Sequence, residues 1–556
     1  MSRFPWRWLA LALILALAGA LRLVDLGSVR LDPFYDAAVR SMGVSWHNFF
    51  FGAYEPGGSV SIDKPPVDLW LQVASVKLLG WGPVALKLPE ALAGTAAVAL
   101  LYAAIRRPFG EIAGLVAALA LAVLPIEVVT SRSDTMDGVM MLLLALALLL
   151  VVRACLSERH CTAWLLGAAA ALGVAFDVKL LESLVALPGL AAIALLGLPR
   201  APAPLAKASS GRPDEPSDVA ATVARASGGW TLTALRLAAA AVVYVVVALA
   251  WLGATLLYPT HERPWAIGST NGSAWNAAFV FNGSERISGK AVEVAQAPGS
   301  VTIAPPSPTR LLAGSGELPG NWLGWIALAA LLLGAFALVV LVRQRAGRVP
   351  RAIAVGTLLW LLTGLVLFSQ MARLHPRYVE SFVPAVAAGF GIGVGLIASS
   401  PSRTRWLALP LAALLLWPLV VSVEAVRAKA SDAGNVGALA PAEQRALSAY
   451  LLAHRGGARY ELAAGSATAV ASLIVADRLP VLMLTTYDGR PLTTVAQLRR
   501  ASNRGEVRYA FLSSLCGRHP RATNAGCAPA ARWVVTHATD VSQAARLRSG
   551  TLWRLP

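Results

Sequence analysis

The sequence predicts a multi-span α-helical membrane protein with a small α/β domain at its C-terminal end. Three observations lead to this fold class. The 556 residues are 56% hydrophobic and only 14% charged, and a mean hydropathy of +0.61 is too high for an ordinary soluble protein. Apolar runs of roughly 20 residues, long enough to cross a bilayer, recur throughout 1–425. From 426 to 556, short apolar strands alternate with helical patterns instead.

We expect about eleven membrane spans, because that many apolar runs have a suitable length. The first run, Trp8 to Leu21, follows Arg3 and Arg7 and lacks a convincing small-residue cleavage site. We therefore expect an uncleaved first span, and a removed signal peptide is the alternative. The other runs lie at 84–105, 112–130, 137–152, 163–177, 180–198, 232–257, 321–342, 352–370, 378–398 and 405–423.

Arg and Lys residues are concentrated in the loops on one side of these spans, and they explain most of the formal net charge of +18. Since positively charged loops stay in the cytoplasm, the N-terminus is expected there. An odd number of spans then places the C-terminal domain in the periplasm or outside the cell, with the chain in the plasma (inner) membrane. The basic residues are scattered rather than massed on one face, which argues against a nucleic-acid partner.

The chain is expected to divide into a transmembrane domain, 1–425, and a C-terminal α/β domain, 426–556. In the C-terminal domain, helices alternate with strands in the order β-α-β-α-β, and no Gly-rich phosphate fingerprint is present, so we assign it no chemistry. Its strands are expected at 460–464, 480–486 and 507–512 and its helices at 467–477 and 493–502. In the transmembrane domain we expect a first outer loop, 25–83, a flexible cytoplasmic linker, 199–230, and a second outer loop, 258–320.

The four cysteines form two pairs in different surroundings. Cys155 and Cys161 lie in a basic loop that should be cytoplasmic, so free thiols are expected. Cys516 and Cys527 lie in the C-terminal domain, and a disulfide is favoured if that domain is outside the cytoplasm.

Charged residues gather at the ends of the spans that should face outward. A charge inside a span costs at least ~2.5 to 3.5 kcal/mol, so such groups usually line a wet cavity. The short loops that carry them make a shared polar cavity at the outer face more plausible than simple loop solubility. The clusters are Asp32 with Asp36; Asp63 with Lys64; Arg132, Asp134 and Asp137; Asp177, Lys179 and Glu182; and Arg373, His375, Arg377 and Tyr378.

Three stretches of the first outer loop carry a resemblance to a known family. They are the acidic patch Leu31 to Asp36, the aromatic run Trp46 to Gly52, and the element Asp63-Lys64-Pro65-Pro66. Together they resemble the bacterial branch of the protein mannosyltransferase and aminoarabinose transferase superfamily, which is glycosyltransferase family 39-like and has the GT-C fold. Within it the chain is similar to the YkcB-type group. The resemblance implies an enzyme that moves a sugar from a polyprenyl-phosphate carrier to an acceptor on the outer membrane face.

The resemblance also implies roles for individual residues. Asp63 looks like the family's metal- or acceptor-contacting carboxylate, and Lys64 resembles a lysine that contacts the carrier phosphate. Asp137 and Lys179 match two further family positions, and Arg377 with Tyr378 resembles a late motif on the phosphate side. The stretches Arg263 to Asn271 and Phe281 to Gly283, with Arg286, look typical of the YkcB-type branch.

One departure from the family pattern concerns the general base. Many members carry Asp-Glu in the first outer loop, whereas this chain has Leu31-Asp32. Asp32, Asp36 and Asp63 therefore all remain candidates for the base. A second departure is Asp177, which would be a partner for Lys179.

The chemistry of sugar transfer explains why these residue types are needed. The leaving phosphate is anionic and the transition state resembles an oxocarbenium ion, so cations must hold the phosphate while a carboxylate takes the acceptor's proton. Lys64, Lys179, Arg373 and Arg377 suit the first task, and Asp32 or Asp63 suits the second, with inversion at the anomeric carbon. Asp63 with a neighbouring His or Asp would also suit a divalent cation (Mg, Mn or Zn), and no other cofactor is expected.

Two other functions stay open on the sequence. The first is a transporter or flippase for a lipid-linked sugar, which should show paired interrupted helices and internal repeats rather than charges gathered at one face. The second is a relative that binds a lipid-linked sugar without transferring it. The sugar, a mannose-like hexose or a pentose, and the acceptor, a lipid, a glycan or a protein, are not fixed by the sequence.

Overall fold

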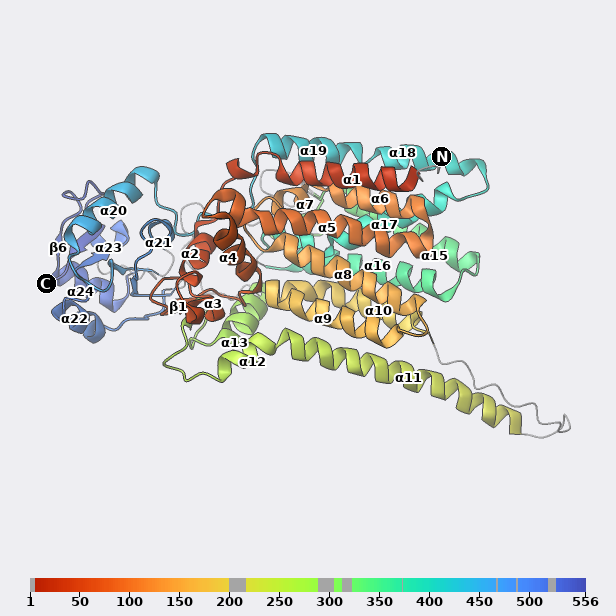
Figure 1. Ribbon diagram of the computed structural model, residues 1–556, viewed down its shortest axis with the longest axis horizontal. Helices are drawn as coiled ribbons and strands as arrows, with labels where there is room; N and C mark the ends of the chain where they lie inside the picture. The colour runs from red at the N-terminus through yellow and green to blue at the C-terminus, as the bar shows by residue number, and fades with distance from the viewer. Residues whose placement is uncertain are drawn as a thin grey trace.

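The computed structural model of the chain describes residues 6–199, 217–288, 305–312, 323–372, 374–466, 469–486, 489–518 and 527–556. An elongated bundle of helices carries a mixed α/β domain at one end (Figure 1). Among these residues, nine helical stretches are long and apolar enough to cross a membrane. They are Trp6–Ser28, Pro83–Phe109, Asp137–Leu156, Cys161–Gly197, Trp230–Ala248, Trp325–Arg343, Arg348–Gln370, Pro376–Ala398 and Arg403–Arg427.

The stretch Cys161–Gly197 contains two helices that run in opposite directions. A 3-10 turn, η2 (Leu180–Ala186), separates α9 (Cys161–Lys179) from α10 (Leu187–Gly197). Lys179, the last residue of α9, pairs with Asp137 at the start of α8 (Asp137–Leu156), whereas Ile193 near the end of α10 accepts a hydrogen bond from Cys155 near the end of α8. The two helices therefore correspond to two of the expected spans.

One expected span, 112–130, is broken in the structure. α6 (Glu111–Val123) ends before Leu124, which is extended, and Pro125 then opens the short helix α7 (Pro125–Thr130). Proline disfavours the helical conformation for the residue before it and lacks an N–H donor, which explains the break at this point.

Small residues let the helices of the bundle approach closely. A Cβ atom added at Gly391 of α17 (Val383–Ala398) would lie 2.6 Å from the backbone nitrogen of Ala117 in α6, and one at Gly395 would lie 2.7 Å from the Cα of Ala113. In lipid such close backbone packing replaces the hydrophobic driving force that operates in water. The remaining helices of the bundle are α1 (Trp6–Leu23), α5 (Pro83–Phe109), α11 (Ser217–Ala248), α15 (Trp325–Arg343), α16 (Arg348–Gln370), α18 (Ala408–Ala413) and α19 (Leu416–Arg427), with 3-10 turns η1 (Leu26–Ser28), η5 (Pro376–Phe382) and η6 (Arg403–Leu407).

The segment 199–230, expected to be a flexible linker, is helical in its second half. Helix α11 begins at Ser217, and the run of alanines after it favours a helix over a flexible spacer. The first half of the segment falls mostly outside the described residues.

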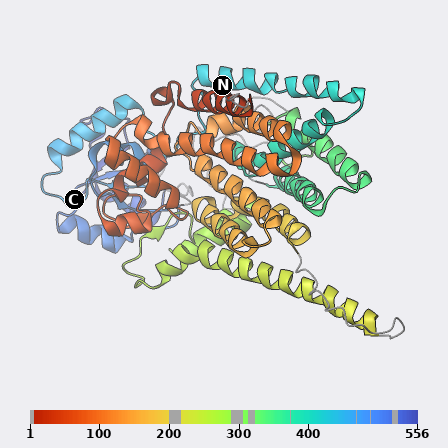
Figure 2. The same ribbon diagram turned by 45° about the vertical axis from the view of Figure 1, so that its right-hand side comes forward.

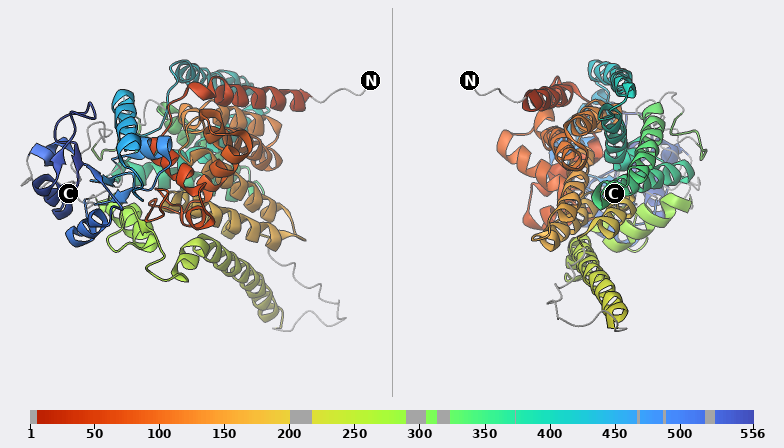
Figure 3. Two further views of the ribbon diagram at one scale, coloured as in Figure 1. Left: turned by 60° about the vertical axis from the view of Figure 1, so that its left-hand side comes forward. Right: turned by 90° about the vertical axis from the view of Figure 1, so that its right-hand side faces the viewer.

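The two long loops fold together at one end of the bundle. The first forms α2 (Pro33–Met42), α3 (Trp46–Phe51), β1 (Val60–Ser61) and α4 (Val67–Leu79), and the second forms α12 (Ala250–Leu256), β2 (Trp265–Ala266), α13 (Ala274–Asn276), the π-helix η3 (Ala277–Ser284) and α14 (Glu285–Ser288). β1 and β2 pair in parallel and bind the loops to each other. Both loops lie at the end that carries the C-terminal domain, and the N-terminus lies at the opposite end (Figures 1 and 3).

The C-terminal domain is a five-stranded sheet with the strand order β4-β3-β5-β7-β6. Strands β3, β4 and β5 are parallel, and β7 pairs antiparallel with both β5 and β6. The order β3-α21-β4-α22-β5 matches the expected β-α-β-α-β pattern, to which β6 and β7 are added. The elements are α20 (Pro441–His454), β3 (Ala463–Ala464), α21 (Ala471–Asp477), β4 (Leu482–Met483), α22 (Val495–Asn503), β5 (Tyr509–Phe511), α23 (Ser514–Arg518), α24 (Pro529–His537), β6 (Thr539–Asp540) and β7 (Leu552–Arg554).

Specific contacts hold this domain against the first outer loop, and Figure 2 shows the two lying together. The Arg40 Nε of α2 donates to the carbonyl oxygen of Val475 in α21 at 3.2 Å. The buried Glu55 carboxylate accepts hydrogen bonds from the backbone of its own loop, at Gly57 and Ser59, and at 3.3 Å from the Val481 N–H just before β4.

Candidate active site

Three carboxyl groups meet at the start of α2. Asp32 is the N-cap residue and accepts a hydrogen bond from the Phe34 N–H at 3.0 Å, while its own N–H donates to Asp134 Oδ2 at 2.9 Å. Asp36 is buried one turn later, and burial together with the charges of Asp134 and Asp32 raises its pKa well above the usual range. A buried carboxyl group whose pKa is raised in this way ionises less readily than an exposed one, which disfavours Asp36 as the general base.

Asp63 and Lys64 lie in the turn between β1 and α4, next to the second outer loop. Lys64 Nζ donates to the Tyr35 hydroxyl at 3.0 Å and lies 3.9 Å from Asp63 Oδ1. Asn282 of η3 donates to the Asp63 carbonyl at 2.8 Å and to Asp63 Oδ2 at 3.2 Å. Burial alone would lower the pKa of Lys64, but Asp63 and Tyr35 raise it above its ordinary value, so the ammonium group is charged.

Lys179 is fixed between two carboxylates at the start of the η2 turn. It forms a close ion pair with Asp137, the first residue of α8, and lies 3.0 Å from Glu182 Oε2. The Thr135 hydroxyl donates to the other oxygen of Asp137 at 2.9 Å. The alternative in which Asp177 is the partner of Lys179 is wrong, because Asp137 and Glu182 take that place.

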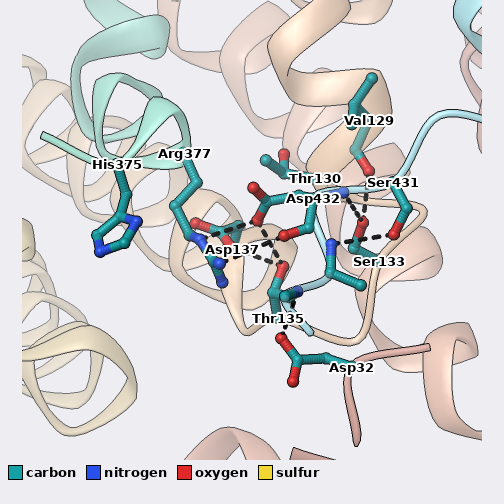
Figure 4. A network of polar contacts seen from close by, with 12 residues as sticks. Asp32, Val129, Thr130, Ser133, Thr135, Asp137, His375, Arg377, Ser431 and Asp432 are labelled. Carbon is teal, nitrogen blue, oxygen red and sulfur yellow. Dashed lines mark hydrogen bonds and ion pairs between the residues drawn. The ribbon is translucent and has the colours of Figure 1, made fainter. Parts of the chain in front are cut away.

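Arg377 makes an ion pair with a residue that the sequence analysis did not single out. Its Nε lies 3.1 Å from Asp432 Oδ2, and its Nη2 donates to the Asp432 carbonyl at 3.3 Å. The Thr135 hydroxyl oxygen also lies 3.2 Å from Asp432 Oδ2, and the Asp432 N–H donates to the Ser133 hydroxyl at 3.0 Å (Figure 4). Burial raises the pKa of Asp432 to about 7 even though Arg377 acts to lower it.

Asp432 belongs to a short connection, 431–435, that joins α19 to the C-terminal domain and crosses the acidic cluster. Within this connection the Gly434 N–H donates to Asp32 Oδ2 at 2.8 Å, and the Ser431 hydroxyl donates to the Arg30 carbonyl at 3.0 Å. The Arg30 guanidinium also donates to the carbonyl of Ala433 and to the side chain of Asn435. The connection therefore covers both Asp32 and Arg377.

Beside these groups lies a cavity of about 220 Å³ with two kinds of lining. Lys64, Lys179 and Arg286 contribute three positive charges against the single carboxylate of Glu182, and Asn282 and Tyr378 contribute further polar atoms. The rest of the lining is apolar and comes mainly from η2, α16 and the residues around them. It includes Leu181, Leu184, Val185, Leu367, Phe368 and Met371.

The remaining predicted residues are Tyr378 and His375, Arg373, and the four cysteines. Tyr378 lies with its ring centre 5.8 Å from Lys179 Nζ and 5.2 Å from the ring of His375. His375 Nε2 lies 3.3 Å from Arg286 Nη1, so the histidine reaches the second outer loop. Arg373 lies outside the described residues. Cys516 and Cys527 are joined in a disulfide, whereas Cys155 and Cys161 are free thiols.

The sequence also predicts Asp63 as a ligand for a divalent cation. No group of three His, Cys, Asp or Glu side chains suited to a metal ion occurs in the described part of the chain. The groups that contact the Asp63 carboxylate are the Lys64 ammonium and the Asn282 Nδ2 amide nitrogen, which are hydrogen-bond donors and cannot act as metal ligands. The described residues around Asp63 therefore do not fit a metal ion.

The structure thus brings four of the predicted residues together around Tyr35. This side chain is buried and interacts electrostatically with Lys64, Asp63, Arg377 and Asp32. Tyr35 and Asp432 were both missed by sequence reasoning. Asp432 could have been found from its position, because 431–435 is the polar connection that directly follows the last apolar run on the expected outer side.

Comparison with protein families gives two matches on separate parts of the chain. Residues 63–208 match "Dolichyl-phosphate-mannose-protein mannosyltransferase", and residues 447–537 match "Putative mannosyltransferase YkcB-like, C-terminal". The first match begins at Asp63 and includes Lys64, Asp137 and Lys179, and the second covers much of the C-terminal domain. Over these two segments the chain is similar to YkcB-type proteins.

Two curated relatives show the same similarity. The chain is 31% identical over 265 residues to "Putative mannosyltransferase YycA" and 31% identical over 259 residues to "Putative mannosyltransferase YkcB", both of Bacillus subtilis (strain 168). The alignments cover 48% and 47% of this chain, and 34% and 32% of those proteins. The chain thus matches about a third of the length of its curated relatives.

Solved structures establish the fold of the chain as GT-C. ArnT from Cupriavidus metallidurans bound to undecaprenyl phosphate matches with a TM-score of 0.53 at 16% identity, over 98% of this chain and 97% of that one. The oligosaccharyltransferase AglB from Archaeoglobus fulgidus, in complex with an inhibitory peptide and a dolichol-phosphate, matches with a TM-score of 0.54 at 12% identity, over 92% and 70%. The predicted fold class is confirmed.

Proposed function

We propose that this protein is a membrane glycosyltransferase that transfers a sugar from a polyprenyl-phosphate carrier to an acceptor at the outer face of the membrane. The observation that carries the proposal is the cavity in which Lys64, Lys179 and Arg286 meet an apolar wall. Three cations suit a phosphate, and apolar side chains suit the first isoprene units of its tail. The family matches and the lipid phosphates bound to the two solved relatives support the same carrier class.

The geometry favours Asp63 as the general base. Its Oδ1 has no hydrogen-bond partner among the described residues, and the side chain keeps some exposure at 11%. Both carboxylate oxygens of Asp32 instead accept backbone hydrogen bonds, from Phe34 and Gly434. Asp32 is therefore assigned a positioning role, in which it holds the start of α2 and the connection 431–435.

The reaction follows from these placements. An acceptor hydroxyl attacks the anomeric carbon of the donor sugar while Asp63 takes the hydroxyl proton, so a new glycosidic bond forms as the bond to the phosphate oxygen breaks. Lys64 and Lys179 stabilise the negative charge on the departing polyprenyl phosphate. Attack from the face opposite the leaving group inverts the anomeric configuration.

The proposal includes an orientation in the plasma membrane. Both long loops and the C-terminal domain lie at the same end of the bundle, away from the N-terminus (Figure 1). The cavity is at this end too, because Lys64 of the first loop and Arg286 of the second line it. The Arg-rich and Lys-rich loops of the sequence favour a cytoplasmic N-terminus. The cavity then opens near the outer leaflet, and the C-terminal domain is periplasmic or extracellular.

The test uses the purified full-length protein with labelled polyprenyl-phosphate sugars and a membrane extract. We expect sugar transfer by the native protein and its loss in Asp63→Asn, while the control Asp25→Asn, an exposed residue of the same loop, stays active. Donor binding without transfer by the native protein would instead indicate a non-catalytic binder. Movement of intact donor across a vesicle membrane, without its consumption, would indicate a transporter.

A further inference from the structure

The C-terminal domain contains a cavity of about 1380 Å³ that is separate from the proposed active site. It lies at the carboxyl ends of two neighbouring parallel strands, where Gly465 and Ser466 follow β3 and Leu512 and Ser513 follow β5. Helix α20 forms the opposite wall, and the turn that precedes β7 closes one side. We call this cavity the β3–β5 crevice.

The topology of the sheet explains why a crevice forms at this point. From β3 the chain passes through α21 to β4 on one side, and it then returns through α22 to β5 on the other side of β3. The chain therefore leaves β3 toward β4, whereas it leaves β5 in the opposite direction, toward β6 and β7. In open α/β sheets this reversal leaves a gap outside the carboxyl ends of the strands, and ligands commonly bind in it.

The charges around the β3–β5 crevice favour an anionic ligand. Arg445 of α20 and Arg546 and Arg548 of the turn line it, against the single carboxylate of Glu443. Within the described residues none of the three arginines forms an ion pair. Arginine pairs well with both phosphate and carboxylate groups, because its planar fork of donors matches either anion.

Size and polarity narrow the class of ligand further. Typical small-molecule pockets have volumes of about 300 to 1,000 Å³, so this crevice has room for more than one sugar unit. Hydroxyl groups of Ser466, Ser513, Ser514 and Thr551 lie in its lining, as does the aromatic side chain of Tyr450. Side chains of these kinds suit a ligand rich in hydroxyl groups.

We propose that the β3–β5 crevice binds an anionic glycan and that this glycan is the acceptor of the transferase. The identity of this glycan as the acceptor rests on the function proposed above, whereas the binding of an anionic glycan to the crevice does not. Leu439 and Ala440 of the crevice wall follow Asn435, the last residue of the connection over Asp32 and Arg377, by only a few positions. The contacts from Arg40 to Val475 and from Glu55 to Val481 hold the crevice in a fixed position relative to the active site.

The test measures binding of soluble polymers to the full-length protein in detergent, without any sugar donor. The probes are poly(glycerol phosphate), polygalacturonate and neutral dextran. We expect the native protein to bind at least one anionic polymer and Arg546→Gln/Arg548→Gln to bind it roughly 10- to 100-fold more weakly. The matched control Arg499→Gln/Arg500→Gln changes two exposed arginines of α22 outside the crevice and should bind like the native protein.

Each outcome of this test decides the proposal. Equal binding by the two double variants, equal binding of dextran, or no binding of either anionic polymer would overturn it. The preference between the two anionic polymers identifies the ligand as phosphate-bearing or carboxylate-bearing. The binding test contains no donor, so its result is independent of the separate transfer assay. Polymer binding here with no transfer in that assay would overturn the transferase and leave the crevice standing, and transfer in that assay without polymer binding here would do the reverse.

Discussion

The Nε of Arg377 lies 3.1 Å from Oδ2 of Asp432, and this ion pair connects the helical bundle to the segment that leads into the C-terminal domain. Arg377 belongs to a motif that the sequence resemblance assigns to the phosphate side of the site. Asp432 is therefore paired with the guanidinium group that a carrier phosphate would also contact. Two residues further along, the Gly434 N–H donates a hydrogen bond to Asp32. The connection 431–435 therefore contacts both Arg377 and Asp32.

Replacing Asp432 by Asn should strengthen binding of the carrier phosphate. The amide removes the negative charge that competes for Arg377 but can still accept a hydrogen bond, so we expect a dissociation constant for undecaprenyl phosphate about 3- to 10-fold lower. Displacement of a fluorescent carrier analogue from the purified protein measures this. Asp25→Asn is the control, and unchanged or weaker binding by Asp432→Asn would show that the two anions do not compete.

The same competition should depend on pH. Asp432 has a pKa of about 7, so it is largely ionised at pH 8 and largely protonated at pH 6. Protonation weakens its hold on Arg377, and carrier binding should improve as the pH falls from 8 to 6. Since the phosphate also titrates near pH 6, the quantity to follow is the ratio of affinities of the native protein and Asp432→Asn. This ratio should approach one at low pH, and a ratio that does not change with pH would contradict the assignment.

Replacement by Asn should affect the stability of the protein at Asp32 but much less at Asp63. Asp32→Asn keeps only one oxygen for the two backbone donors of Phe34 and Gly434, so we expect about 1 to 3 kcal/mol of lost stability along with lost activity. Asp63→Asn should abolish activity with a much smaller change in melting temperature. Thermal unfolding and transfer assays on both variants test this, and equal thermal losses would remove the distinction between a positioning residue and a base.

Whether a contact in this site could be predicted from the sequence depends on how the two residues are connected along the chain. The pairing of Lys179 with Asp137 was within reach, because two spans joined by a short inner loop bring their outer ends together. The cover that Gly434 and Asp432 form over Asp32 and Arg377 was not, since no local pattern sets where a connection hundreds of residues away will lie. The β-α-β-α-β order of the C-terminal domain could be predicted from alternating patterns, but its extra strands β6 and β7 lack such alternation.

The ion pair of Lys179 with Asp137 provides a test that separates stability from chemistry. Lys179→Met leaves Asp137 buried without its partner, and this should cost about 3 to 5 kcal/mol. The double variant Lys179→Met/Asp137→Leu removes both charges and should regain much of that stability. Transfer activity should stay low in both, because the phosphate has lost one of its cations. Activity restored together with stability would show that Lys179 has only a structural role.

Glu461 in the C-terminal domain provides a prediction independent of the active site. Burial and the neighbouring Asp477 raise the pKa of Glu461 to about 9, whereas in an unfolded chain it would titrate near 4.5. Between these values the folded state binds a proton that the unfolded state does not, so this group makes folding less favourable as the pH rises, by up to about 1.4 kcal/mol per pH unit. Glu461→Gln keeps the shape without the ionisable group and should raise the melting temperature at pH 8 more than at pH 5. With Glu506→Gln as a half-buried control, equal shifts at both pH values would contradict a neutral Glu461 in the folded protein.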